Sequence, residues 1–132
     1  MLISIIRVGM NSIQNLDTRI LIHTLFSRTI RQKVYLKNIF DARTKNLIDS
    51  DKAFVKLVIM STIRNLGQID NIIGRYVKRK PPNIIEDILR IGVAQILFIK
   101  TPHYAAVSTS VDLAKRLGYS KMSGFINFVL RC

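Results

Sequence analysis

Residues 84–99 read IIEDILRIGVAQILFI and form the most apolar run of the chain. On a helix of 3.6 residues per turn, these apolar side chains fall on almost every side rather than along one stripe. Such a helix has to be buried among other elements, so the run is expected to be the central helix of an all-α bundle. Within it, Ala94 and Leu97 are predicted to be core positions, at which a charge would unfold the domain.

The start of this helix carries Asn83 and, three positions later, Glu86, a spacing that resembles a capping box. We therefore interpret Glu86 as a cap. Glu86 and Asp87 are adjacent, so on a helix their side chains point about 100° apart and are not expected to act as a catalytic pair. The run contains too many charged residues and is too short for the roughly 20 apolar residues that cross a membrane.

Upstream of this run, apolar residues recur at helical spacing over four further segments. Asp17 is predicted to cap a helix that ends near residue 32, and a short helix over 34–42 would turn Tyr35, Leu36 and Ile39 inward. Asp51 is predicted to cap a third helix, which ends or kinks at Gly67. A fourth follows over residues 69–77 and leads into a basic cluster, residues 78–80, before two prolines.

Downstream, Thr101 and Pro102 are predicted as the N-cap and first position of a helix that Gly118 ends. Asp112 and Arg116 are expected to pair across one turn of that helix. A final helix over residues 120–131 completes a total of six or seven helices without a strand. The fold class predicted is therefore an all-α helical bundle around a buried central helix.

The length of 132 residues suits one domain with one core. No linker divides the chain, and the predicted organisation is an N-terminal extension over residues 1–16 followed by a helical domain over residues 17–132. Met1 to Ile6 is apolar but lacks the basic region and the cleavage site of a secretion signal.

The chain is strongly basic, with 21 Lys and Arg against eight Asp and Glu and a formal net charge of +13. Such an excess favours a polyanionic partner, of which nucleic acid is the commonest. The alternative is an ordinary solvated surface with a basic bias. The charge is uneven, because residues 1–82 hold fifteen of the basic side chains while residues 83–100 are locally neutral.

Signatures of catalysis are missing from the sequence. It has neither a Gly-rich dinucleotide loop nor a Gly-Lys-Ser/Thr phosphate loop, and no metal-ligand spacing. The single Cys132 cannot form an internal disulfide, and His23 and His103 are far apart. We predict no catalytic, metal or cofactor site, and a reducing, cytoplasmic compartment fits this cysteine usage.

Four stretches in the second half carry a family resemblance: ILRIGVAQILF at 88–98, PHYAAV at 102–107, VDLAKR at 111–116 and GFINFVLR at 124–131. Their order and spacing resemble the NusB family, in which a central helix is followed by a Pro-led helix and a closing helix. DKAF at 51–54 and residues 64–70 extend the likeness, which covers roughly residues 17–131.

The family has two main branches. One comprises transcription antitermination factors, which bind RNA together with a small ribosomal protein. The other is the N-terminal domain of ribosomal-RNA cytosine-C5 methyltransferases of the RsmB type, also called Sun or Fmu. The DKAF, AAV and VLR segments look like the methyltransferase branch, whereas antitermination factors tend to end this region in Gly-Val-Leu-Asp and to begin with an Arg cluster.

The resemblance therefore implies an accessory module that binds ribosomal RNA. It implies no enzymatic activity for this chain alone, because the Rossmann-like catalytic domain and its Pro-Cys nucleophile motif are not in the sequence. S-adenosylmethionine would be expected only in a downstream catalytic domain, and Cys132 follows Arg131 rather than Pro. An antitermination factor and a protein-binding adaptor without RNA affinity are the alternatives, and a membrane is not expected as a partner.

The binding surface that the family resemblance implies, together with the faces of the predicted helices expected to be exposed, indicates two groups of RNA-binding residues. The first group is Arg19, Arg28 and Arg31 on the first helix. The second is Lys115, Arg116 and Lys121 near the last two helices, and the two groups are expected to adjoin. Asn127 is a further candidate, whose amide would either hydrogen-bond RNA or satisfy backbone groups at the edge of the bundle.

Overall fold

The computed structural model describes residues 2–132, with side chains from residue 16 onward. The helices, in chain order, are α1 (Leu2–Arg31), α2 (Leu36–Thr44), α3 (Asp49–Arg64), α4 (Leu66–Gly74), α5 (Asn83–Leu97), α6 (His103–Arg116), the 3₁₀-helix η1 (Ser120–Met122) and α7 (Ser123–Arg131). The described chain contains no strand, which confirms the all-α prediction.

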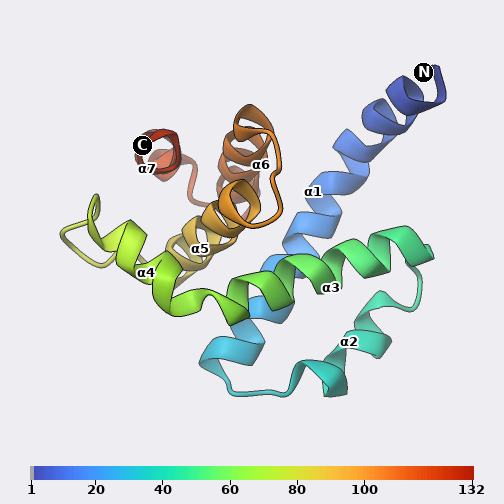
Figure 1. The fold of residues 1–132 in the computed structure, drawn as a ribbon, viewed down its shortest axis with the longest axis horizontal. Coiled ribbons are helices and arrows are strands. Elements are labelled where there is room, and N and C mark those ends of the chain that lie inside the picture. The colour runs from blue at the N-terminus through green and yellow to red at the C-terminus, as the bar shows by residue number, and fades with distance from the viewer. Residues whose placement is uncertain (1) are drawn as a thin grey trace.

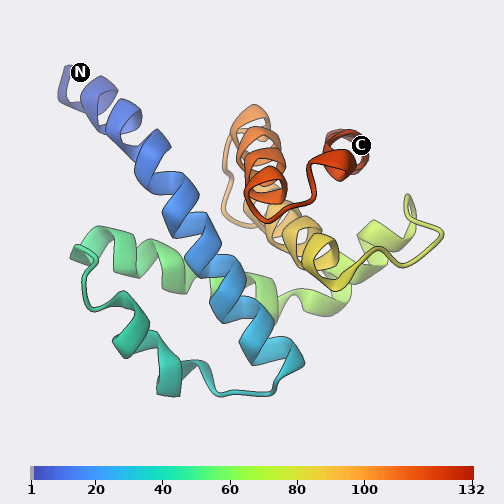
Figure 2. The ribbon, with the colours of Figure 1, turned by 180° about the vertical axis from the view of Figure 1, so that it is seen from behind.

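Helix α5 occupies the centre of the molecule, with α1 and α3 on one side and α4, α6 and α7 on the other (Figures 1 and 2). Two hydrophobic clusters meet on it. One joins α4, α5, α6 and α7, and the other joins α1, α2 and α3 with Ile91 of α5. The prediction of a central buried helix is confirmed, because nine of the fifteen α5 residues are buried.

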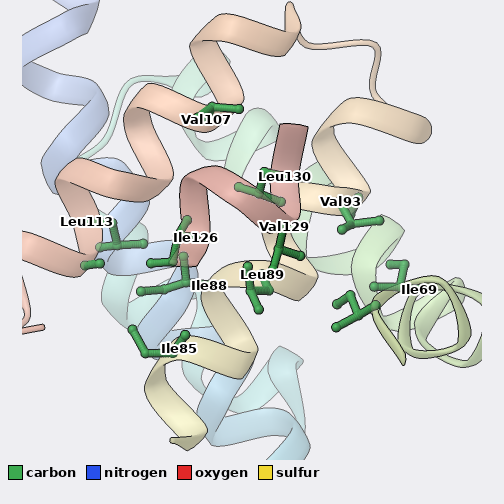
Figure 3. Packing of buried hydrophobic residues seen from close by; sticks show 13 residues of the cluster. Ile69, Ile85, Ile88, Leu89, Val93, Val107, Leu113, Ile126, Val129 and Leu130 are labelled. Atoms are coloured by element: carbon green, nitrogen blue, oxygen red, sulfur yellow. The ribbon is translucent and has the colours of Figure 1, made fainter. Parts of the chain in front are cut away.

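The first cluster is built where α7 lies against α5 and α6 (Figure 3). Ile126 lies beside Ile88 of α5 and Leu113 of α6. At Gly92 of the ILRIGVAQILF motif, a Cβ atom would lie 3.0 Å from Cδ1 of Leu130 and 3.1 Å from Oγ of Ser110, so these side chains would have to shift to admit it.

Two positions that the periodicity assigns to the core, Leu97 and Tyr35, are exposed in the structure. Ala94 is 0% exposed, as predicted, but Leu97 is 44% exposed, because α5 ends there and the chain leaves the bundle. Tyr35 was expected to point inward and is 72% exposed. It stands at the N-cap of α2, outside the regular helical turn on which its inward orientation was predicted.

Most of the predicted helix caps are also wrong. Helix α1 runs through Asp17 without a break, and α3 begins after Ile48, so that Asp51 lies in its first turn. Asn83 is the first residue of α5 rather than its cap. The break between α3 and α4 falls at Asn65 rather than at Gly67. Capping is a local preference of about 1 kcal/mol, which tertiary packing overrides.

Pro102, rather than Thr101, stands at the N-cap of α6. Asp112 and Arg116 form no ion pair in the part of the chain with described side chains. The predicted stop at Gly118 is confirmed: its φ is +91°, and Tyr119 N–H donates to the carbonyl of Ala114 at 2.8 Å. Only glycine adopts this left-handed conformation without strain.

Candidate nucleic-acid interface

Asp87 is the centre of a buried polar network between α1 and α5. Its side chain is 1% exposed, and it accepts hydrogen bonds from Ser27 Oγ at 2.6 Å and from Arg31 Nε and Nη2 at 2.9 Å each. Arg31 Nη2 also donates to Glu86 Oε1 at 2.8 Å. The two adjacent carboxylates therefore bind one guanidinium, and the interpretation of Glu86 as a helix cap is wrong.

Arg90 extends this network to α4. It donates from Nε and Nη2 to the two carboxylate oxygens of Asp70, at 2.8 and 2.9 Å, and from Nη1 to Asp87 at 3.1 Å. Burial would raise the pKa of Asp87, but the hydrogen bonds from Arg31 and Ser27 and the nearby positive charges lower it below its usual 3.8. The ionised Asp87 thus joins α5 to α1, and Arg90 continues the network to Asp70 of α4.

This network changes the role predicted for Arg31. We expected it to face water and contact phosphate, but its guanidinium is bound to Glu86 and Asp87, whose hydrogen bonds raise its pKa. The two acids within the apolar α5 run indicate that a cation must pair with them, since charged groups are rarely buried unpaired. Which cation that is depends on the packing of α1 against α5, which sequence periodicity does not reveal.

Arg19, also predicted to bind RNA, is buried, with only 6% exposed. Its guanidinium lies over the Phe54 ring at 5.1 Å, and burial lowers its pKa to about 10. Among the side chains from residue 16 onward, its Nε and Nη1 atoms find no hydrogen-bond partner. Arg19 lies three residues before Ile22 and seven before Phe26, on the buried stripe of α1, and this spacing was the overlooked signal.

The other predicted RNA-binding residues remain accessible. Arg28 is partly exposed near the end of α1, and Lys115, Arg116 and Lys121 are exposed at the end of α6 and in η1. Asn127 Oδ1 accepts a hydrogen bond from Arg131 Nε at 2.7 Å rather than from a backbone group, and its role toward RNA stays a prediction.

A polar groove of about 430 Å³ lies between α6 and α7. It brings together two predicted residues, Lys115 and Asn127, with three that sequence reasoning missed: Tyr104, Asp112 and Arg131. Tyr104 is 78% exposed. The apolar stripe of α6 could have indicated its exposure, but the groove itself depends on how α7 packs beside α6.

Both histidines have backbone partners. His103 Nε2 hydrogen-bonds to the Leu130 carbonyl, which joins the start of α6 to the end of α7. His23 Nε2 donates to the Ile84 carbonyl at 3.0 Å. The part of the chain that the structure describes holds no cluster of His, Cys, Asp and Glu suited to a metal, and none of its helices is both long and apolar enough to cross a bilayer.

His23 is expected to make stability depend on pH between about 5 and 7. Burial lowers its pKa below 6.5, and this outweighs the Ile84 hydrogen bond and the Asp87 charge. In this range the unfolded chain binds more protons than the native state, so stability falls as pH falls, by at most about 1.4 kcal/mol per pH unit. Urea unfolding of wild type and His23→Gln at pH 5, 6 and 7 measures this. His103→Gln is the control variant. If stability depends on pH in His23→Gln as it does in wild type, the assignment to His23 is contradicted.

Known proteins resemble the chain in both sequence and fold. It is 28% identical over 107 residues to ribosomal RNA small subunit methyltransferase B from Erwinia tasmaniensis, covering 79% of this chain and 25% of that protein. It is 39% identical over 80 residues to transcription antitermination protein NusB from Picosynechococcus sp., covering 57% of this chain and 38% of that protein. The chain thus spans about a quarter of the methyltransferase's length.

Among solved structures, NusB from T. maritima matches with a TM-score of 0.76 at 23% identity, over 88% of this chain and 87% of that one. This supports the fold. The model of the NusB family matches residues 14–132. Since that match covers nearly the whole chain, and the helical order agrees with it, the protein belongs to the NusB family.

Proposed function

We propose that this NusB-family domain binds RNA and serves as the accessory ribosomal-RNA-binding module of an RsmB-type small-subunit cytosine-C5 methyltransferase. It contributes affinity and positioning, while methyl transfer and S-adenosylmethionine binding belong to a catalytic domain in the parent protein. The similarity to small-subunit methyltransferases supports this branch. A cytoplasmic location follows from this role.

The observation that carries the proposal is the distribution of ion pairs. Among residues 16–132, the ion pairs join Arg31 and Arg90 to Asp70, Glu86 and Asp87, in one network at the helix junction. That network holds three of the eight acidic residues. Most other Lys and Arg side chains are exposed without an ion-pair partner, and such a surface attracts phosphates through counterion release.

Affinity for small-subunit ribosomal RNA is expected to fall linearly with salt on a log–log scale, with a slope near −0.7 for each single-strand phosphate neutralised. Replacing Arg28, Arg116 and Lys121 by Ala removes three accessible cations. This triple variant should bind more weakly across many RNA sequences, with a slope flattened by roughly two units. Fluorescence anisotropy over a salt series measures both.

The matched control removes the same charge elsewhere, by replacing Lys78, Arg79 and Lys80 with Ala. All three are exposed in the connection between α4 and α5. If the control flattens the slope and the first variant does not, the binding surface lies at that cluster. Thermal stability should hardly change in either variant, because exposed charges contribute little to folding. A wild-type chain without salt-sensitive RNA binding would instead favour the protein-binding adaptor.

A second candidate is a transcription antitermination factor, favoured by the 39% identity to the Picosynechococcus protein of that name. This function predicts a complex with a small ribosomal protein that increases affinity for RNA. Anisotropy with and without that protein separates the two functions. Enhanced binding supports antitermination, whereas no effect, together with binding to a methyltransferase catalytic domain, supports the first proposal.

A further inference from the structure

The groove is lined by α6 and α7, which run antiparallel. The hydrogen bond from His103 to the Leu130 carbonyl joins the start of α6 to the end of α7, and the turn with η1 joins the opposite ends. Tyr104 and Lys115 line the groove from positions eleven residues apart on α6. At about 1.5 Å per residue, this separates them by about 16 Å along the helix axis.

The groups that line this groove differ along its length. Arg131 lies toward the same end as Tyr104, and Lys115 marks the other end. Asn127 Oδ1 holds the Arg131 guanidinium at 2.7 Å, which leaves the Asn127 amide nitrogen as a donor. Asp112 adds a carboxylate acceptor on the α6 side. Cations at both ends thus flank a polar middle, and an exposed ring stands beside one of them.

We propose that this groove binds a short single-stranded segment of RNA, with Tyr104 as the platform on which one unpaired base stacks. Lys115 and Arg131 contact the phosphates, and Asp112 and Asn127 face the hydrogen-bonding edges of the bases. This inference rests on the proposed RNA-binding function and adds the form of RNA and the site that takes it.

The exposed Tyr104 ring favours single-stranded RNA over a duplex. A base stacks on an aromatic side chain only when it has left its own stack, which is common in loops and bulges and costly in a helix. The length of about 16 Å accommodates roughly five nucleotides at the stacked spacing of about 3.4 Å. Asp112 lies about 4.5 Å along the helix axis before Lys115, so its carboxylate repels phosphates from the interior of the groove and leaves them to Lys115 and Arg131 at its two ends.

The test compares two exposed tyrosines. Tyr104 lines the groove, whereas Tyr35 is similarly exposed at the start of α2 and lies outside it. For a labelled single-stranded RNA of mixed sequence, Tyr104→Ala should weaken binding by about 5- to 150-fold, the loss expected for one stacked base. Tyr104→Phe should retain wild-type affinity because it keeps the ring, and Tyr35→Ala should bind like wild type.

Two further measurements complete the test. Lys115→Ala should flatten the salt slope by about 0.7, and a hairpin in which the same nucleotides are paired should bind more weakly than the single strand. If wild type binds RNA with a normal salt slope, and neither Tyr104→Ala nor Lys115→Ala changes that binding, RNA does not bind in this groove. The proposed function would then still hold. Equal affinity for the hairpin would also overturn it. A wild-type chain that binds no RNA even at low salt would overturn both.

Discussion

Ala94→Asp is expected to leave the protein largely unfolded at pH 7. Ala94 is 0% exposed in the cluster that joins α4, α5, α6 and α7. Burial raises the pKa of a carboxyl by about 3 to 5 units, which costs about 4 kcal/mol at pH 7, because the group takes up a proton once its pKa exceeds the pH. The added volume costs about 1–3 kcal/mol more in a packed core. The sum approaches the whole stability expected for a domain of this size. Circular dichroism and urea unfolding measure the loss.

Two variants isolate the cause. Ala94→Asn has nearly the same size without the charge, so it should be destabilised less than Ala94→Asp. Leu97→Asp introduces the same charge in α5 at a position that is 44% exposed, and it should stay folded with a loss of about 2 kcal/mol. Equal destabilisation by Ala94→Asp and Leu97→Asp would show that α5 does not bury the face that the structure buries.

Asp87→Ala is expected to destabilise the protein by about 3–5 kcal/mol and to lower Tm by about 10–25 °C. The substitution removes the buried acceptor of hydrogen bonds from Ser27, Arg31 and Arg90, and leaves Arg31 paired with Glu86 and Arg90 paired with Asp70. Each lost hydrogen bond to a charged group costs about 1.5–3 kcal/mol, and the losses at one site are not additive. Differential scanning calorimetry at pH 7 measures the shift, and Asp112→Ala, which removes an exposed acid, should change Tm little.

Two further results would identify the ion pair as the cause. Replacing Arg31 together with Asp87 should cost less than the sum of the two single replacements, since Arg31 has already lost its buried partner. The pKa of Asp87 is lowered in the native state, so its contribution is present above pH 3.8 and is lost as pH falls through the native pKa. Asp87→Ala should therefore unfold less steeply in acid than wild type. A purely additive double variant with an unchanged acid transition would contradict the pairing.

The sequence by itself determined the helical class of the fold and the centre of the bundle, but not the ends of most helices. The run at 84–99 is apolar on nearly all sides, and α5 is buried as that pattern requires. The stop at Gly118 was also predictable, because a left-handed turn is a local property of the backbone. Both features depend on neighbouring residues, which is why periodicity and turn chemistry find them.

For the candidate site, the sequence predicted the accessible cations Arg28, Lys115, Arg116 and Lys121, and was wrong about Arg19 and Arg31. The error has one physical cause. A cation on a helix is predicted to be solvated unless its partner is known, and a partner on another helix has no fixed spacing in sequence.

The tertiary structure alone decided which charges are paired within the fold and which stay exposed to solvent. The packing of α1 against α5 places Arg31 on Asp87, more than fifty residues away in sequence. The packing of α7 beside α6 forms the groove that contains Tyr104 and Arg131. Both arrangements depend on helices that meet only after the chain has folded, because ion pairs and grooves are properties of distance in space.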